Sequence, residues 1–324
     1  MRRRLLLVGS SPLIHLIARQ LDSDLARRAE LEVIMINRRE RIVYAPLIKS
    51  LLGKKKYFKP KPYDYLKVTH KEVSSISLPR RQVITTSGTF DYDHLVLDQT
   101  PTFTPEEVDR LSEEVKKLVM QLSSRVHLGQ RRRATVKFAG EASISWQLSL
   151  AVASDIKALP AAVAGLLSVQ TDAAPSSQLV SFLRLAGVGK LQQETVSTTV
   201  EIRPPKRIVE PKHIKGATVG AQGYPHLNQF LNFEGYFDAI VVDHPFRRFH
   251  NTIGVDLTLA KSIVRNIEAA VDLTRQHPIS MPQRALLLSS DQSHFYLGNR
   301  RASSGLLART TAVLDRKRLG RFFL

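Results

Sequence analysis

The sequence predicts an α/β chain with parallel sheets, organised as two dinucleotide-binding (Rossmann-like) modules with a C-terminal amphipathic helix. Short apolar runs alternate with amphipathic helical patterns along the 324 residues, an alternation typical of strand–helix–strand units. One arrangement, a short strand followed by a glycine-led turn and a helix, begins near residue 5 and again near residue 134. This is the arrangement with which dinucleotide-binding folds begin, so we expect two such modules.

The first half of the chain divides into strands, two helices and one long basic segment. The apolar runs predict strands at residues 5–8, 31–36, 73–77, 82–86 and 90–97. Helices are expected at 13–25 and 105–124, and the second of them opens with Thr104, Pro105 and two glutamates, which are typical of a helix start. The stretch 44–65, with basic, proline and aromatic residues, is expected to be a lid or a long loop.

The second half repeats the pattern and then returns to the first module. Strands are predicted at residues 134–139, 163–169, 236–243, 285–289 and 294–297, and helices at 146–159, 178–185, 256–274 and from about 304. We therefore expect a first module over 1–133, an inserted second module over 134–217, a return to the first over 218–284 and C-terminal strands with a basic amphipathic helix over 285–324.

Charge is the second strong signal in the sequence. A formal net charge of +19 predicts attraction to a polyanion, which leaves nucleic acid, anionic lipid and an acidic partner open. The absence of cysteine rules out disulfides and thiolate metal sites. The histidines form no metal-ligand spacing, no nucleophile elbow is present, and no run is long enough to span a bilayer. With no secretory signal, we expect a cytoplasmic location.

The first turn has lost most of the glycines that a dinucleotide-binding turn uses. Its three glycine positions hold Gly9, Ser11 and Ile14, and Pro12 removes one N–H group that would face a phosphate. Gly9 and Ser11 are candidate contacts of an FAD pyrophosphate. For Gly9, the alternative is that a tight strand–helix turn simply requires glycine.

Several phrases, in order along the chain, resemble the type II NADH dehydrogenase family of FAD- and NAD(P)-dependent flavoproteins. Residues 32–37 with 43–47 are similar to the family's second strand and the loop after it, 90–97 to the strand under the flavin, and 235–243 to the strand that ends in a ribityl-binding aspartate. The resemblance implies an FAD-binding first module, an NAD(P)H-binding second module, a quinone acceptor and a peripheral membrane location. It makes Asn37 and Asp243 further candidate FAD contacts.

The departures from this family occur at the nucleotide sites. Asn37 replaces the acidic residue that would hold the adenosine ribose, and Asp98 replaces the small residues that approach FAD. In the second module Gly140 is the candidate NAD contact, but Glu141 follows it, and a carboxylate there repels phosphate. We therefore expect FAD to bind weakly if it binds, and the residues disfavour NAD(P)H.

The last twenty residues predict a basic amphipathic helix. Its candidate membrane contacts are Leu307, Leu314, Arg316, Lys317, Arg318, Phe322 and Phe323. Such a helix lies in an anionic lipid interface or against a membrane-bound partner. The alternative is a terminal helix docked on its own domain with a basic outer face.

Three functions follow, and the residues favour the first. In the first, we expect a membrane-peripheral pseudoenzyme, scaffold or complex subunit with the fold of a FAD-dependent NAD(P)H:quinone oxidoreductase, and with both nucleotide sites degenerate. The second function is an active oxidoreductase of that kind, for which no catalytic residue is assigned. The third is a nucleic-acid binder, which the lack of aromatics among the basic clusters disfavours. Whether the chain forms a homodimer is left open.

Overall fold

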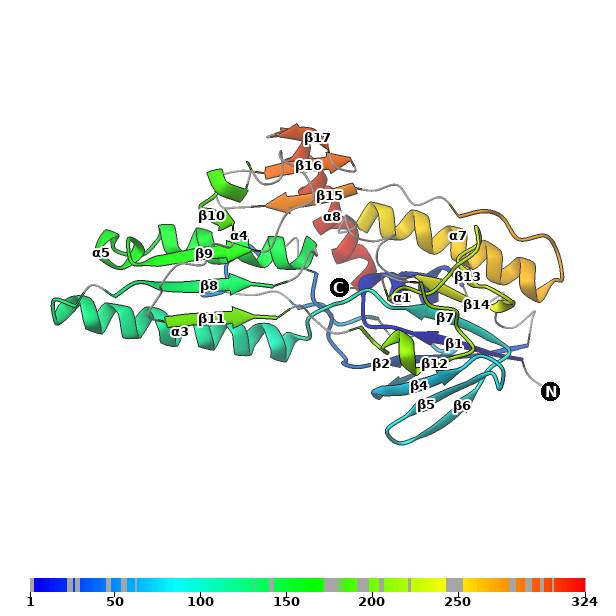
Figure 1. Cartoon of the computed structure of the whole chain (residues 1–324). Coiled ribbons are helices and arrows are strands. Elements are labelled where there is room, and N and C mark those ends of the chain that lie inside the picture. Colours follow the sequence, from blue (N-terminus) through cyan, green and yellow to red (C-terminus); the bar gives the residue numbers. More distant parts are fainter. Residues whose placement is uncertain are drawn as a thin grey trace.

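Two sheet-based modules lie side by side, and connecting segments of the chain run between them (Figure 1). The computed structural model describes residues 3–323 except 22–25, 27–29, 45–47, 54–56, 62, 131, 140–142, 172–180, 182, 191–197, 204–206, 221–222, 243–252, 280–283, 289–292, 298–299 and 305. The predicted fold class, α/β with two dinucleotide-type modules, is confirmed: the strands of the second sheet come between two strands of the first along the chain.

The first module is built on a six-stranded sheet. Its strands, in spatial order, are β13 (Asn232–Phe233), β14 (Tyr236–Val242), β7 (His94–Asp98), β1 (Arg3–Val8), β2 (Leu31–Asn37) and β3 (Leu66–His70). All neighbours are parallel except β13 and β14. The carboxyl ends of the parallel strands therefore share one edge of the sheet.

The central strand β1 is apolar and buried from Leu5 to Val8, because both faces of its sheet are covered there. Leu5 and Leu7 belong to the core shared with helices α1 (Pro12–Gln20) and α7 (Ile253–Val271). Leu6 and Val8 point the other way, into the core under a smaller sheet. That sheet comprises β12 (Ile214–Lys215), β4 (Val73–Ser77), β5 (Gln82–Thr85) and β6 (Gly88–Asp91), and the short 3-10 helix η2 (Pro211–His213) leads directly into β12.

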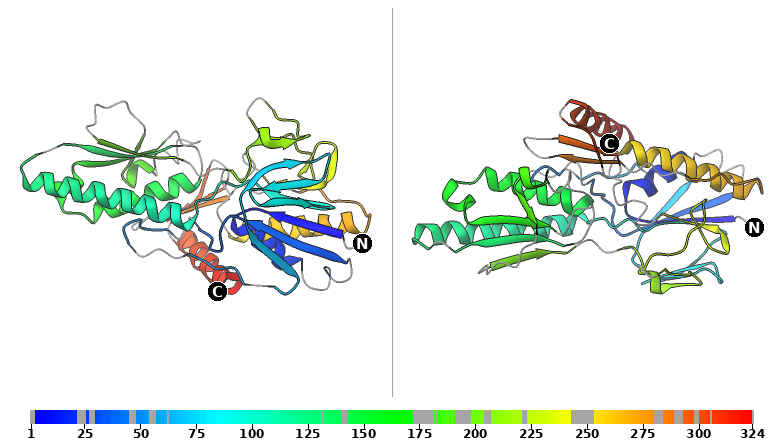
Figure 2. Two further views of the ribbon diagram at one scale, coloured as in Figure 1. Left: turned by 90° about the horizontal axis from the view of Figure 1, so that it is seen from below. Right: turned by 45° about the horizontal axis from the view of Figure 1, so that its top comes forward.

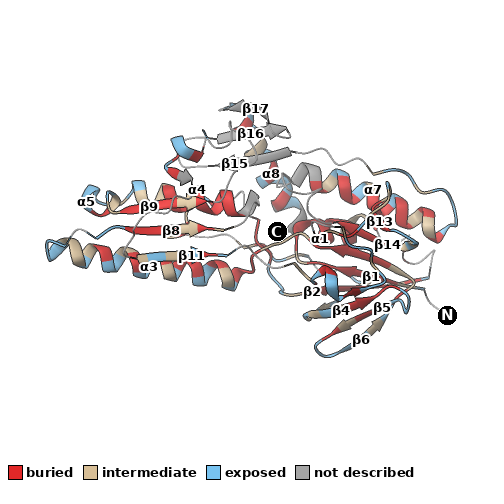
Figure 3. Ribbon diagram, in the orientation of Figure 1, coloured by how far each residue is buried: buried red, intermediate tan, exposed pale blue. Residues whose placement is uncertain are grey.

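The second module has a four-stranded parallel sheet with a long helix on each face (Figure 1). Its strands, in spatial order, are β10 (Val188–Lys190), β9 (Leu167–Thr171), β8 (Ala134–Phe138) and β11 (Thr198–Ile202). Its helices are α3 (Pro105–His127), α4 (Ser143–Lys157) and the short α5 (Ala161–Ala164). Figure 3 shows that the helix faces turned toward this sheet are buried.

The chain ends in a three-stranded antiparallel sheet and a helix. These are β15 (Arg284–Leu288), β16 (Ser293–Leu297), β17 (Arg300–Ser304) and α8 (Leu306–Phe323). Figure 2 shows this sheet and α8 beside the junction of the two modules. Leu319 of α8 is fully buried in the core of the first module, so the terminal helix is part of that fold.

The described part of the long segment 44–65 is a loop that packs against both modules, with Tyr44 and Phe58 in the core of the first. Ile48 and Leu51 are buried in the core of the second module. Asp155 of α4 accepts hydrogen bonds from the backbone N–H groups of Leu51 at 2.7 Å and Leu52 at 3.0 Å. A carboxylate that binds successive backbone N–H groups fixes the local path of the chain.

Two predicted strands differ from the structure. The run 90–97 was expected to be one strand, but it divides between β6 and β7, which lie in different sheets. The backbone of Arg4 accepts a hydrogen bond from the N–H of Asp93 and donates one to its carboxylate, which fixes this crossing. The strand predicted at 163–169 begins only at Leu167, because Ala161–Ala164 forms a helical turn after Pro160. Six of the described strands were not predicted: β3, β10, β11, β12, β13 and β17.

Candidate functional site

The carboxyl edge of the six-stranded sheet holds the three described candidate cofactor residues. In open α/β sheets, ligands bind at this edge, where the strands end and the helices begin. Gly9 and Ser11 follow β1, Asn37 is the last residue of β2, and Asp98 is the last residue of β7. The structure thus brings together three of the predicted cofactor residues. Asp243 and Gly140 lie outside the described residues.

Gly9 is required by a close approach of two strands. Its N–H donates to the carbonyl of Ile36 at 3.1 Å. A Cβ atom on Gly9 would lie 2.9 Å from Cβ of Asp98 and 3.3 Å from Cβ of Ile14. Gly9 is not among the glycines with positive φ. The sequence left open a phosphate contact or a turn requirement, and the structure adds a third reason, namely the space that the side chain of Asp98 occupies.

Ser11 caps helix α1 and contacts Asp98 at the same time. Its hydroxyl accepts the N–H of Leu13 at 3.2 Å, which satisfies one of the free donors of the first helical turn. The same hydroxyl donates to Oδ2 of Asp98. Both side chains are fully buried, so this serine is directed into the protein rather than toward a ligand at the surface.

The second oxygen of Asp98 is also occupied. Oδ1 accepts the backbone N–H of Thr100 at 3.1 Å and its hydroxyl at 2.5 Å. A carboxylate close to a helix N-terminus is favoured by the partial positive charge of the helix. Asp98 therefore has hydrogen-bond donors on both oxygens and lies at the turn where this fold presents its backbone to a phosphate.

The side chain of Asn37 makes its hydrogen bonds within the protein. Its side-chain amide lies 3.0 Å from Nε2 of His15, and its Oδ1 accepts the backbone N–H of Arg39 at 3.0 Å. Burial, with a smaller effect of neighbouring His70, lowers the pKa of His15 to about 3. The imidazole is therefore neutral near pH 7, and its Nε2 can accept from the amide of Asn37. Asn37 is almost fully buried, so its side chain is not available to a ribose.

Gln99 holds the returning chain over the end of β7. Its Nε2 donates to the carbonyl of Val209 at 2.8 Å, and its Oε1 accepts the N–H of Val209 at 3.2 Å. Val209 belongs to the segment between the second module and the first, and it is buried. Sequence reasoning missed Gln99, because a contact over 110 residues has no local signal.

These described residues do not fit a dinucleotide. A carboxylate occupies the phosphate turn, the residue at the ribose position is buried, and the returning chain binds at the end of the neighbouring strand. In the second module, the turn that contains Gly140 is not described, so the comparison rests on the first module. Among the described residues, no group of three acidic or histidine side chains could hold a metal ion.

Helix α8 has a buried face and an exposed basic face with apolar residues. Ala308, Asp315 and Leu319 are buried. Leu306 is 82% exposed, Leu307 55%, Val313 53% and Leu314 45%. The basic side chains on this helix are all exposed: Arg309, Arg316, Lys317, Arg318 and Arg321. The helix therefore docks on its own domain and still presents apolar and basic side chains, and its contact with a membrane stays a prediction.

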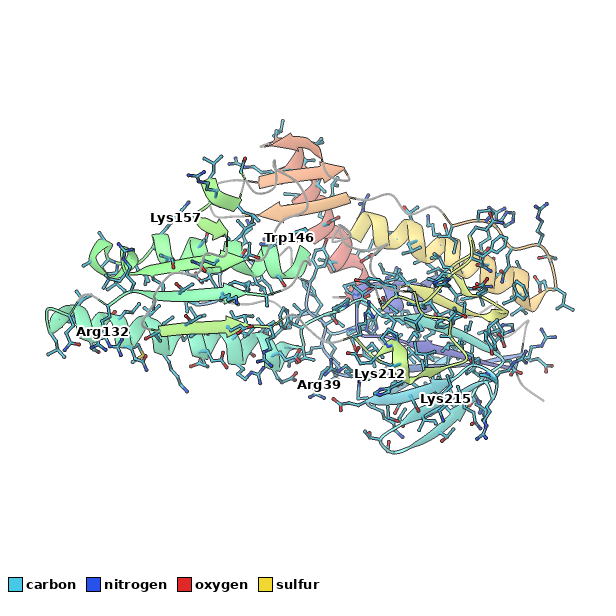
Figure 4. All side chains as sticks on the ribbon, in the orientation of Figure 1. Arg39, Arg132, Trp146, Lys157, Lys212 and Lys215 are labelled. Carbon is cyan, nitrogen blue, oxygen red and sulfur yellow. The ribbon has the colours of Figure 1, made fainter. Side chains whose placement is uncertain are left out.

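Two further facts limit the membrane prediction. The side chains of Phe322 and Phe323 lie outside the described residues, although both belong to α8. Figure 4 shows Arg132 at the end of the second module, far from α8, so this exposed arginine does not extend the basic surface of the helix. Among the described helices, none is long and apolar enough to cross a membrane.

Comparison with solved structures places the fold among flavoprotein reductases with two dinucleotide-binding modules. The sulfide:quinone oxidoreductase of Aquifex aeolicus matches with a TM-score of 0.71 and 11% identity, over 99% of this chain and 91% of that one. A chain of the covalent putidaredoxin reductase–putidaredoxin complex matches with a TM-score of 0.57 and 13% identity, over 92% of this chain and 81% of that one.

The same fold occurs in a different context. A chain of the Tetrahymena thermophila mitochondrial ATP synthase matches with a TM-score of 0.59 and 11% identity, over 98% of this chain and 92% of that one. No family model and no curated protein sequence matches this chain. At these identities the likeness shows the fold of FAD-dependent pyridine nucleotide oxidoreductases and leaves activity to the chemistry of the site.

Proposed function

We propose that this chain is a pseudoenzyme that acts as a scaffold or complex subunit at an anionic membrane surface. The observation that carries the proposal is the buried carboxylate of Asp98 at the phosphate turn, with hydrogen-bond donors on both oxygens. A pyrophosphate at the same turn would meet a like charge in a low-dielectric environment. The buried pair of Asn37 and His15 removes a second contact that an adenosine would need.

A role in an assembly is supported by the fold comparison. One of the matching chains belongs to a mitochondrial ATP synthase, so this fold occurs within a larger complex. The net charge of +19 favours an acidic or anionic neighbour.

Helix α8 is the proposed membrane contact. Each exposed basic residue near an anionic surface contributes about 1 kcal/mol. Leu306, Leu307, Val313 and Leu314 add apolar area that water now contacts. Charge and apolar insertion together give stable attachment where one of them alone gives marginal attachment.

The flavin test decides between the pseudoenzyme and the active oxidoreductase. A bound flavin would absorb between about 350 and 500 nm, because the chromophore belongs to the cofactor. We expect the purified full chain to show no such absorbance. Added FAD should not remain with the protein through gel filtration. Stoichiometric FAD in the purified protein would overturn the pseudoenzyme and restore an FAD-dependent NAD(P)H:quinone oxidoreductase.

The membrane contact is tested by flotation with anionic and neutral vesicles. Truncation before α8 is unsuitable, because it would also remove Leu319 from the core of the first module. Paired substitutions Leu306→Ser with Leu307→Ser, and Arg309→Glu with Lys317→Glu, change exposed side chains only. Each pair should reduce flotation with anionic vesicles, and about 1 M salt should reduce that of the wild type.

Arg132→Glu is the matched control, since Arg132 is exposed but distant from α8. It should leave flotation nearly unchanged. Equal flotation of all variants, or no preference for anionic vesicles, would remove α8 as the membrane contact.

A further inference from the structure

We propose that the carboxylate of Asp98 is a built-in anion that takes the place of the dinucleotide phosphate, and that removing it creates a site for small oxyanions. The inference rests on the proposed function, because it explains how the fold is completed without a nucleotide. It goes further by naming the group that fills the site and the chemical class of ligand that can replace it.

The electrostatic requirement of the turn is the first step. The N-terminus of α1 carries a partial positive charge, and its first N–H groups lack partners within the helix. Ser11 connects the helix N-terminus to Asp98, because its hydroxyl accepts from the N–H of Leu13 and donates to the carboxylate of Asp98. Thr100 supplies two more donors from the other side. The turn therefore holds one negative group between donors from two strand ends.

The available space is the second step. Asp98 is fully buried, and a single Cβ on Gly9 would already approach it to 2.9 Å. There is no room for a phosphate beside this side chain. Without the side chain, the Ser11 hydroxyl and the Thr100 donors would lose the acceptor that the structure shows for them, and an oxyanion of the right size can replace that acceptor.

Size matching makes the experiment specific. Asp98→Ala removes a carboxylate, and formate has that composition. Asp98→Gly removes the methylene group as well, and acetate has the composition of the lost side chain. Asp98→Asn keeps the volume but loses the charge and one acceptor, so it leaves no space for an added anion.

Thermal unfolding of the full chain is measured in formate, acetate and inorganic phosphate, each against chloride at equal ionic strength. We expect the variants to unfold several degrees below the wild type. Formate should raise the midpoint of Asp98→Ala most, and acetate that of Asp98→Gly. The wild type and Asp98→Asn should not respond beyond chloride. Asp64→Ala, at an exposed position, is the control and should behave as wild type.

The outcomes separate this inference from the proposed function. If no oxyanion raises the midpoint of Asp98→Ala or Asp98→Gly above chloride, or if phosphate stabilises the wild type, the inference is wrong. If both variants fail to fold, the loss in unfolding midpoint caused by Thr100→Val is compared between the wild type and Asp98→Asn. A larger loss in the wild type supports the charged contact, and equal losses overturn it. Flavin absorbance of the wild type tests the pseudoenzyme independently of these results.

Discussion

Tyr44 donates a hydrogen bond of 2.6 Å to Oδ2 of Asp315, although 271 residues separate them. Both side chains are buried. The bond joins the loop after β2 to the inner face of α8, and Arg318 lies 3.9 Å from the other carboxylate oxygen. The terminal helix is thereby fixed in orientation, with its basic residues outward.

Removal of this hydroxyl should loosen α8. We expect Tyr44→Phe to lower the free energy of unfolding by about 1–3 kcal/mol, because a buried carboxylate loses a donor. Tyr57→Phe is the matched control, since the Tyr57 hydroxyl contacts Asp109 at the surface. Urea unfolding measures the loss, and limited proteolysis reports whether α8 is released. Equal losses in both variants would contradict a special role of the Tyr44 contact.

The buried imidazole of His15 should make stability depend on pH. Its pKa is about 3 in the folded protein and 6.5 as the ordinary value, so the unfolded chain binds a proton first as pH falls. Stability from this group is therefore complete above about pH 6.5 and is lost progressively toward pH 3, by roughly 3 kcal/mol between pH 7 and pH 4.

His15→Gln, which cannot take up a proton, should flatten this part of the pH profile. His127→Gln, at an exposed position, should not. The comparison uses urea midpoints of the three proteins over this pH range. Identical slopes for wild type and His15→Gln would show that His15 is accessible to protons in the folded protein.

Asn37→Asp restores the acidic residue that the resembling family has at this position. We expect a loss of about 1–3 kcal/mol, because the carboxylate is buried and cannot donate to Nε2 of His15. The new negative charge should raise the pKa of His15. NMR titration of the imidazole measures that shift. An unchanged pKa together with an unchanged unfolding midpoint would contradict the buried contact.

Gly9→Ala tests the close approach of β1 and β7. The added methyl group would overlap with Asp98, so we expect a loss of about 1–3 kcal/mol. Gly165→Ala is the comparison variant and should lose less, because Gly165 has a φ of −67° and an added Cβ would lie 3.3 Å from the carbonyl oxygen of Ala161, against 2.9 Å from Asp98 at Gly9. A Gly9→Ala protein as stable as wild type would mean that the turn has more space than the contacts indicate.

The fold was predictable because its signals are local. The apolar run of β1 indicates a strand covered on both faces, and the capping residues before α3 mark the helix start. The division of residues 90–97 between two sheets was not predictable. It depends on Asp93 meeting the backbone of Arg4, a contact that spans 89 residues.

The candidate site was only partly predictable. The resemblance to the type II NADH dehydrogenase family identified Asp98 and Asn37 as departures from that family's nucleotide-site residues, and spacing placed Gly9 and Ser11 in the first turn. It could not show that Ser11 and Thr100 converge on Asp98, or that His15 and Asn37 pair, because these contacts join different strand ends. The clamp of Gln99 on Val209 had no signal at all.

Because the donors of Ser11 and Thr100 meet at Asp98, the residues of this turn depend on one another when single residues are replaced. Replacing Asp98 alone removes the carboxylate that accepts from the hydroxyls of Ser11 and Thr100. Replacing Asn37 alone removes the amide that lies 3.0 Å from Nε2 of His15. Each of these single substitutions therefore lowers stability before any ligand can compensate. Folding stability alone thus opposes separate changes at Asp98 and Asn37, and only a ligand that supplies the lost contacts would offset the cost.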